Sequence, residues 1–358
     1  MNLSNGGVKV KKLLKTLLIL LLAAVIAFGG LVGFLTVTEY KPNDIEPIKL
    51  KGTGSGAVPA ENLSVLSWNI GYAGLGAGED FFMDGGTHIR PDSPETVNAY
   101  LDGIRQSITE NRPADLFLLQ EVDANSSRTY GIDETEILSG RCSAYALNYS
   151  CPFVPFPFPP LGKVKCGLLT TTGYEIREAE RVSLPCPFSW PMRTANLKRC
   201  LLVSRLPVQG TEKELVLVNL HLEAYDDGEG KIAQTMQLMD LMQKEYLNGN
   251  YVIAGGDFNQ FFPGSLDLWP NDHPNLWKPG ILETESLPPG FQYVCDMTVP
   301  TCRLLNQPYD PADVANTQYY VIDGFIVSPN VTVNTVETLD FGFQNSDHNP
   351  VYITVSMK

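Results

Sequence analysis

The chain has few basic residues for its length. Its 358 residues include 26 Lys and Arg against 40 Asp and Glu, which gives a formal net charge of −14. Residues 1–40 contain four lysines and one glutamate, so the rest of the chain has a net charge of −17. Because proteins that bind polyanions contact the phosphates with Lys and Arg, this balance disfavours nonspecific binding of nucleic acid. It remains compatible with a local basic rim and with a carboxylate cluster that binds cations.

The sequence also lacks the cysteine spacings of a metal or redox motif. The seven cysteines form no CxxC pair and no Cys/His spacing typical of a zinc site. Their odd number leaves at least one thiol unpaired, and their spacings match no small disulfide-rich scaffold. Cys295 and Cys302 lie in a turn-rich stretch, and we expect them to be the pair best suited to a disulfide bond.

Internal repeats are absent, and from Asn62 onward the pattern is globular to the end. This length can form two average domains or one large sandwich with a sizeable core. Short apolar runs outnumber helical patterns, which indicates two packed sheets with helices outside. One helix is predicted to start at Pro94, after the N-cap Ser93, and to end near residues 111–113. Another is predicted over residues 230–247.

Charge is missing altogether from residues 17–35. This run of 19 residues is about the length needed to cross a membrane as a helix, and it follows four lysines, Lys9, Lys11, Lys12 and Lys15. A cleaved signal peptide is the alternative, but the run is longer than a usual signal region and residues 36–41 lack a small-x-small cleavage site. Because the lysines precede the run, the positive-inside rule places the rest of the chain outside the cytoplasm. We therefore expect a single-pass anchor in the cell membrane.

Polar residues follow the predicted strands. Six strand ends present carboxylate, imidazole or carboxamide groups, namely Asn69, Glu121, His221, Asp257 with Asn259, Asp323, and Asp347 with His348. Such residues are expected to meet at one edge of a sandwich. Oxygen-rich sites suit hard divalent cations such as Mg²⁺, Mn²⁺ or Ca²⁺. With two imidazoles in reach, the set fits hydrolysis of a phosphoester, in which one imidazole deprotonates water and the other assists the leaving oxygen.

The motifs around these residues occur in a recognisable order. They are Trp68-Asn69, Leu119-Gln120-Glu121-Val122, Asn219-Leu220-His221-Leu222, Gly256-Asp257-Phe258-Asn259, Ile322-Asp323 and Ser346-Asp347-His348-Asn349-Pro350-Val351. In this order they resemble the endonuclease/exonuclease/phosphatase superfamily, which includes deoxyribonucleases, abasic-site endonucleases, neutral sphingomyelinases and inositol-polyphosphate 5-phosphatases. The resemblance covers about residues 62–357. It implies an α/β fold, a four-layered αββα sandwich of two mainly antiparallel sheets with the site at one end.

Composition and the resemblance together divide the chain into three parts. By composition, residues 1–40 are expected to be a cytoplasmic start and transmembrane anchor, and residues 41–61 a stalk rich in Pro, Gly and small residues. The resemblance implies that residues 62–358 are the catalytic domain.

Metal and phosphate binding are implied for five of the residues. Glu121 would be the principal ligand of a Mg²⁺ ion, or of Mn²⁺ or Ca²⁺, with Asn69 and Asp347 contributing. Asp257 and Asn259 would orient the attacking water or hold a second ion and the phosphate.

Acid–base roles are implied for three more. His348 would be the general base, oriented by Asp323. His221 matches the branch of deoxyribonucleases, sphingomyelinases and 5-phosphatases, in which this histidine assists the leaving group. Arg90 and Arg128 follow the first two motif strands and are candidate phosphate ligands, because a guanidinium group pairs well with a phosphate.

The substrate class stays open. Residues 151–161 and 185–192 are rich in Pro and aromatic residues, and they suit either rigid packing loops or an apolar lip that touches lipid or gates a substrate. Together with the anchor they favour a lipid head group or a small phosphoester over nucleic acid. An exported nuclease and a surface binding module that has lost activity are the alternatives. Every motif position is filled, which favours an enzyme, and no partner protein is indicated.

Overall fold

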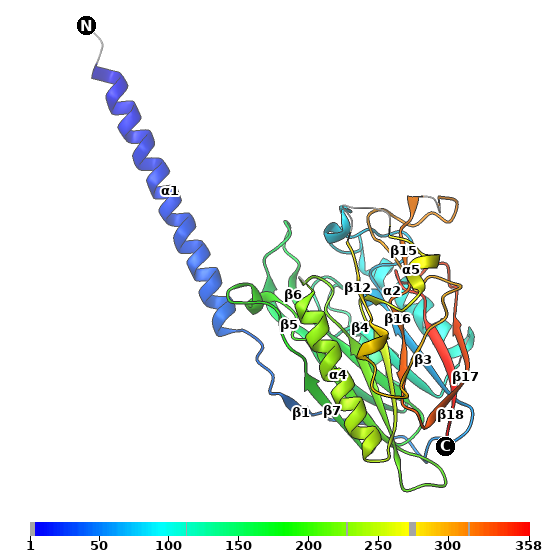
Figure 1. The fold of residues 1–358 in the computed structure, drawn as a ribbon. Helices are drawn as coiled ribbons and strands as arrows, with labels where there is room; N and C mark the ends of the chain where they lie inside the picture. The colour runs from blue at the N-terminus through cyan, green and yellow to red at the C-terminus, as the bar shows by residue number, and fades with distance from the viewer. Residues whose placement is uncertain (1–3, 112, 227, 272–276, 314–315) are drawn as a thin grey trace.

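Two seven-stranded sheets pack face to face, and a long helix projects from one side of them (Figure 1). This arrangement is seen in a computed structural model, which describes residues 4–111, 113–226, 228–271, 277–313 and 316–358. The strands of each sheet are mainly antiparallel, as predicted, and each sheet contains a single parallel pair among the described residues.

The first sheet, sheet I, has the strand order β1-β7-β8-β9-β10-β16-β13. Its strands are β1 (Ile45–Pro47), β7 (Glu178–Ser183), β8 (Cys200–Pro207), β9 (Glu214–His221), β10 (Tyr251–Asp257), β16 (Asp323–Val327) and β13 (Gln292–Val294). Its parallel pair is β9 with β10.

The second sheet, sheet II, has the order β17-β18-β3-β4-β6-β5-β2. Its strands are β17 (Val331–Thr338), β18 (Val351–Met357), β3 (Leu63–Asn69), β4 (Leu116–Asp123), β6 (Gly162–Thr172), β5 (Cys142–Val154) and β2 (Lys51–Gly52). Its parallel pair is β3 with β4.

The two parallel pairs require crossover helices, and these helices form the outer layers. Helix α2 (Pro94–Gln106) joins β3 to β4, and helix α4 (Glu229–Leu247) joins β9 to β10. As predicted, Ser93 caps α2, accepting a hydrogen bond from the Thr96 backbone N–H at 3.2 Å. Because parallel strands cannot be joined by a tight turn, each crossover places its helix on a sheet face.

Three apolar clusters fill the spaces between the four layers. The largest lies between the sheets and includes Val65, Leu118, Leu217 and Ile353. One between α4 and sheet I includes Leu238, and one between α2 and sheet II includes Leu101 and Ile104. The expected αββα sandwich is confirmed.

The remaining elements are short. They are α3 (Glu134–Leu138), α5 (Ser265–Leu268), the strand pairs β11 (Gln260–Phe261) with β12 (Gly280–Ile281) and β14 (Cys302–Arg303) with β15 (Tyr319–Tyr320), and single turns at Gly71–Ala73, Phe82–Asp84, Ser107–Asn111, Met192–Ala195 and Thr284–Ser286.

Helix α1 (Ser4–Val37) is long and apolar enough to cross a membrane over residues 9–37. Its C-terminal end does not stand free. Leu35 is buried against Cys151 and Val154 of β5 and Val164 of β6, and Leu31 packs beside it. The last turns of the helix are therefore fixed to the globular part.

The segment expected to be a stalk, residues 41–61, pairs with both sheets instead. β1 adds to β7, β2 adds to β5, and Val58 bridges Val208. An extended chain rich in Pro and Gly has unpaired backbone groups, and the open edges of the two sheets satisfy them.

The predicted disulfide bond is absent. All seven cysteines, each of which the structure describes, are free thiols, including Cys295 and Cys302. Cys302 is buried in β14 and forms a β-bridge to His348 instead, so the turn-rich sequence around it serves to support the histidine loop.

Candidate active site

The ends of the parallel strands bring four of the predicted side chains together. Asn69 ends β3, His221 ends β9, Asp257 ends β10, and Glu121 lies near the end of β4. The Asn69 side-chain nitrogen donates to Asp257 Oδ2 at 3.0 Å and to Glu121 Oε1 at 3.2 Å. His221 Nε2 lies 3.4 Å from Asp257 Oδ2. These contacts connect sheet I to sheet II at one end of the sandwich.

Asp323 reaches the same place by a different route from the one expected. The sequence suggested that it ends a strand, but it begins β16. Because β16 runs antiparallel to β10, its first residue pairs with Asp257, the last residue of β10. A polar residue next to an apolar run looks the same at either end of a strand, so the pattern could not distinguish the two.

The backbone at Glu121 is strained. Its φ is 55°, and the pairing of β4 with β6 shifts register between Leu119 and Val122. Such a bulge redirects a side chain away from the regular alternation of a strand. A left-handed non-glycine residue costs on the order of 1–3 kcal/mol and is held mainly at functional sites. The strain thus directs the Glu121 carboxylate into the cavity described below.

Asn259 also has a left-handed backbone, with a φ of 50°. Its backbone N–H donates to Asp257 Oδ1 at 2.8 Å, and its side-chain nitrogen donates to the Leu222 carbonyl at 2.9 Å. Asn259 therefore fixes the carboxylate of Asp257 at the end of sheet I.

His348 is held by one nitrogen of its ring and by its backbone. Nδ1 lies 2.8 Å from Asp323 Oδ2, and since an ionised carboxylate can only accept, Nδ1 is the donor. The backbone N–H donates to Ser346 Oγ at 3.2 Å, and the carbonyl accepts from Trp68 Nε1 at 2.8 Å. Nε2 is thereby left to face the site.

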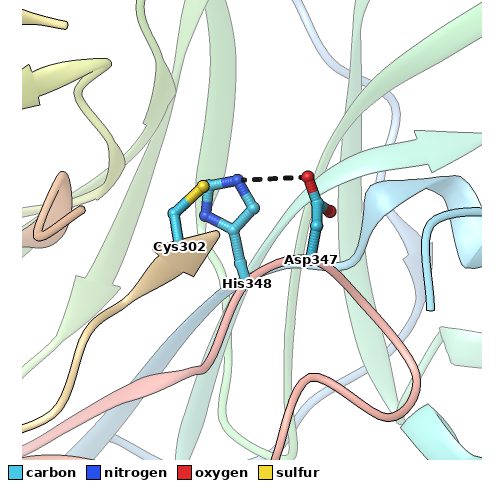
Figure 2. Close-up of side chains that lie close together, drawn as sticks. All are labelled: Cys302, Asp347 and His348. Atoms are coloured by element: carbon cyan, nitrogen blue, oxygen red, sulfur yellow. Dashed lines mark ion pairs between the residues drawn. The ribbon is translucent and has the colours of Figure 1, made fainter. Parts of the chain in front are cut away.

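Nε2 of His348 faces two further carboxylates. It lies 3.8 Å from Asp257 Oδ2 and 3.9 Å from Asp347 Oδ2. Figure 2 shows the ring between the Asp347 carboxylate and the sulfur of Cys302. Burial, the largest single effect, would lower the pKa of His348, but Asp323, Cys302 and Asp347 together outweigh it and hold this pKa well above its usual value.

The pKa of the second imidazole, that of His221, shifts in the opposite direction. Burial lowers the pKa of His221 well below the usual value, and the charges of Arg199 and His348 lower it further. His221 is therefore neutral and can donate one N–H. Two histidines in one site are thus driven to different protonation states, a pattern typical of divided acid–base roles.

The carboxylates repel one another in a buried space. Burial raises the pKa of Asp257 to about 7, and the Asp323 charge adds to the effect. Burial raises the pKa of Asp347 to about 6. The His348 charge opposes this rise, and the Glu121 charge adds to it. A positive ion would relieve this repulsion, and hard divalent cations prefer oxygen donors of this kind.

The donor set therefore fits the metal that the resemblance implies. Glu121 and Asp347 are the carboxylates that would hold it, and Asp257, Asp323 and His348 form a further group with ligand atoms within 4.8 Å of one another. Asn69 presents its amide nitrogen to the carboxylates, and its oxygen accepts from the Gly71 N–H at 3.0 Å. In this arrangement Asn69 positions the carboxylates.

These side chains line a cavity of about 620 Å³. Of the eight predicted strand-end residues, six line it, namely Glu121, His221, Asp257, Asn259, Asp347 and His348, while Asn69 and Asp323 lie behind them.

The two predicted phosphate ligands differ in position. Arg128 is among the described residues that line the cavity, whereas Arg90 is not. Arg128 makes two hydrogen bonds to Asp123, at 3.0 and 2.9 Å, and its guanidinium lies 3.5 Å from the centre of the Tyr72 ring. Arg90 is exposed and lies 5.1 Å from the Tyr130 ring centre. The structure thus brings only Arg128 to the cavity.

Some residues at the cavity carry no motif. Arg199, a neighbour of Glu223, is 4% exposed and donates from Nη1 to the His221 carbonyl at 3.3 Å, while its Nε lacks a hydrogen bond. Arg303 is 1% exposed and holds the Gly76 carbonyl at 2.9 Å. Both arginines were visible in the sequence, but only tertiary contacts bring them here. The sequence feature that comes closest to marking Arg199 is its neighbour Glu223, which follows His221 by two residues.

Comparison with known proteins identifies the family of this chain. Residues 66–348 match the sequence model of the Endonuclease/Exonuclease/phosphatase family. Among curated proteins no significant match was found.

Solved structures share the fold. An endonuclease/exonuclease/phosphatase from Beutenbergia cavernae superposes with a TM-score of 0.53 at 18% identity, covering 83% of this chain and 72% of that one. One from Bacteroides vulgatus gives 0.52 at 16% identity, covering 83% and 99%. A functionally unknown conserved protein from Enterococcus faecalis gives 0.51 at 14%, covering 83% and 100%. At these identities the likeness concerns the fold alone. With the motif order and the family match, it leads to one conclusion: this chain belongs to the Endonuclease/Exonuclease/phosphatase family.

Proposed function

We propose that this protein is a divalent-metal-dependent phosphoesterase, anchored in the cell membrane by α1 with its catalytic domain outside the cytoplasm. Members of its family are hydrolases that act on phosphoester bonds. The observation that carries the proposal is the geometry of His348, whose Nδ1 lies 2.8 Å from Asp323 while Nε2 faces the carboxylates of the cavity. A lipid head group or a small phosphoester is favoured as substrate.

The reaction is attack of water on phosphorus. His348 Nε2 accepts the proton of the water as its oxygen bonds to phosphorus, while Nδ1–H stays hydrogen-bonded to Asp323. The bond from phosphorus to the leaving oxygen breaks, and that oxygen leaves as the alcohol with a proton taken from solvent. Neutral His221 donates a hydrogen bond to this oxygen as its negative charge develops.

The metal would be Mg²⁺, Mn²⁺ or Ca²⁺, held by Glu121 and Asp347 with Asn69 beside them. When bound it supplies positive charge that polarises the phosphoryl oxygens. Asp257 and Asn259 orient the phosphate and the attacking water. Its positive charge near Glu121 would also disfavour the imidazolium form of His348 and so favour the neutral base.

Burial of the helix end supports the membrane anchor. Leu35 is 6% exposed and packs among Cys151, Val154 and Val164. Glu39 pairs with Arg193 at 3.1 Å and with Lys198 at 3.4 Å. Cleavage after the apolar run, as in a signal peptide, would remove Leu35 and expose this apolar surface.

Nuclease activity is the alternative, and the charge distribution disfavours it. Three arginines are among the described residues that line the cavity. Arg128 pairs with Asp123 and Arg199 with Glu223, while Arg303 donates to backbone carbonyls such as that of Gly76. None of the three forms the open basic groove that a nucleic-acid backbone requires. An inactive binding module is disfavoured because every motif position is filled.

The test is hydrolysis of bis-p-nitrophenyl phosphate by the purified full-length protein in detergent with Mg²⁺ or Mn²⁺. We expect His348→Ala to lower kcat by about 10²–10⁴-fold through loss of the base. His88→Ala is the matched control, because His88 is not among the described residues that line the cavity. Wild-type turnover no greater than that of His348→Ala, across metals and pH, would refute the proposal.

A further inference from the structure

The cavity continues beyond the candidate active site to helix α1. Four residues of this helix line it, Phe28, Leu31, Val32 and Leu35. Their spacing of three, four and seven residues places them on one face of a helix. One face of the predicted membrane span therefore forms a wall of the same cavity that contains Glu121 and His348.

The cavity wall next to α1 comes from the two segments rich in Pro and aromatic residues, 151–161 and 185–192. Val154, Pro155, Phe156 and Leu161 line the cavity from the first segment, and Phe188, Pro191 and Met192 line it from the second. The tips of both segments expose large apolar side chains: Phe156 is 68% exposed, Phe158 92%, Trp190 56% and Met192 67%. Large exposed apolar groups gathered next to a membrane helix are typical of a surface that touches lipid.

A hydrogen bond attaches the second segment to the helix. Trp190 Nε1 donates to Thr36 Oγ1 at 3.0 Å. Thr36 follows directly on the apolar run, at the level where the helix leaves the membrane. The exposed apolar tips therefore lie beside the membrane boundary, where Trp is the preferred side chain.

The apolar wall also reaches into the depth of the membrane. No charged residue occurs between Lys15 and Glu39, and Glu39 marks the aqueous side with its ion pairs to Arg193 and Lys198. Phe28 lies nine residues before Val37, the last residue of α1, which corresponds to about 14 Å along the helix. With α1 spanning the membrane as proposed above, this part of the cavity wall lies within the hydrocarbon of the outer leaflet.

The cavity is thus apolar at the helix and polar at the carboxylates. A soluble phosphoester has no apolar part to occupy the wall at Phe28 and Val32, and a nucleic acid would need basic contacts there. A lipid that remains in the outer leaflet matches both ends.

We propose that the cavity binds a membrane phospholipid, with one acyl chain against the Phe28, Leu31 and Val32 face of α1 and its phosphate at Glu121 and His348. This inference rests on the proposed function for the fate of the phosphate. The acyl-chain site itself stands on the shared cavity. Helix α1 is then part of the substrate site as well as an anchor.

The test is photocrosslinking of full-length protein reconstituted in vesicles of phosphatidylcholine and phosphatidylglycerol. A small share of the phosphatidylcholine carries a diazirine on its acyl chain, and crosslinked peptides are mapped by mass spectrometry. We expect crosslinks in residues 151–161 and 185–192 in addition to α1. This readout needs neither metal nor turnover and does not depend on the preferred head group.

Two variant pairs make the result specific. Val32→Trp fills the cavity and is expected to reduce crosslinks to the two segments about fivefold or more, because overpacking excludes the chain. Ile26→Trp is its control, since Ile26 is 65% exposed and is not among the described lining residues.

The second pair, Met192→Glu and Met236→Glu, changes exposed side chains, so folding is preserved. Met192 lines the cavity, whereas Met236, on α4, is not among the described residues that line it. Only Met192→Glu is expected to reduce the crosslinks.

Crosslinks confined to α1, or equal reductions in the paired variants, would overturn the lipid site. Hydrolysis of bis-p-nitrophenyl phosphate by the same samples separates the two proposals. Ile26→Trp is expected to retain it, because Ile26 is not among the described residues that line the cavity. Normal crosslinking without any hydrolysis would refute the proposed function and leave the lipid site standing.

Discussion

The Asp323 carboxylate determines which nitrogen of His348 carries a proton. Asp323→Asn removes the charge that raises the pKa of His348 while nearly preserving shape. We expect kcat to fall by roughly 10²–10⁴-fold, since the ring loses its orientation and tautomer. Because the base works only when neutral, activity rises with pH through this pKa. The acid limb of the pH–kcat profile is therefore expected to move to lower pH in the variant. An acid limb that stays in place would contradict the assigned partnership.

The buried carboxylates make stability depend on pH and on metal. Burial raises the pKa of Asp257 to about 7 and that of Asp347 to about 6, above the ordinary value near 4. A group whose pKa is raised by folding stabilises the protein fully below its unfolded pKa and loses this contribution as the pH rises through the folded value. The metal-free protein is therefore expected to lose stability between about pH 4 and 7.

A divalent cation should reverse that loss. We expect Mn²⁺ at about a hundred times its Kd to raise Tm by roughly 5–10 °C near pH 8, and by much less near pH 5, where the carboxylates are protonated. Thermal melts with Mn²⁺ and with EDTA measure this, and Asp347→Asn should reduce the shift. An equal shift at both pH values would argue against a cation on these carboxylates.

Among the secondary structure elements, the contact between β4 and β9 fixes the two sheets behind the site. Gln120 and Asn219 are both 0% exposed, and Gln120 Nε2 donates to Asn219 Oδ1 at 2.8 Å. Asn219→Ala leaves the Gln120 amide without this partner, which costs about 1–3 kcal/mol. We expect Tm to fall by roughly 2–10 °C in thermal melts. Asn334→Ala, at an exposed asparagine, is the control, and an equal fall in both variants would show that the buried pair is unimportant.

The elements also show what the sequence could predict. An apolar run followed by a carboxylate, imidazole or carboxamide side chain identified β3, β9 and β10, and the Ser93 cap identified α2. These signals are local, so they can be read without the fold. Asp323 was assigned to the wrong end of a strand because polarity marks a boundary but not its direction.

Tertiary contacts explain the features that could not be predicted. The approach of Arg199 to His221 joins residues that are adjacent only through sheet pairing. The pairing of residues 41–61 with both sheets depends on open sheet edges that no local pattern reveals. The wall that α1 contributes to the cavity depends on the packing of Leu35 against Val154. The apolar pattern of a membrane span gives no information about this packing.

For the whole molecule, the orientation of the catalytic domain across the membrane can be tested at one thiol. Cys186 is the exposed member of the seven free cysteines, all of which lie within the described residues. We expect a membrane-impermeant maleimide to label it on intact cells without permeabilisation, and Cys186→Ser to abolish that labelling. Labelling that requires permeabilisation would place the domain in the cytoplasm.

The central proposal is a metal-dependent phosphoesterase site at the shared end of the two sheets. Its most direct test is the initial rate of bis-p-nitrophenyl phosphate hydrolysis as Mn²⁺ is titrated into EDTA-treated full-length protein. We predict a rate that rises from the baseline, saturates with Mn²⁺, and requires much higher Mn²⁺ in Glu121→Gln, which lacks one carboxylate charge. A rate that is independent of Mn²⁺, or one with the same Mn²⁺ dependence in Glu121→Gln, would contradict it.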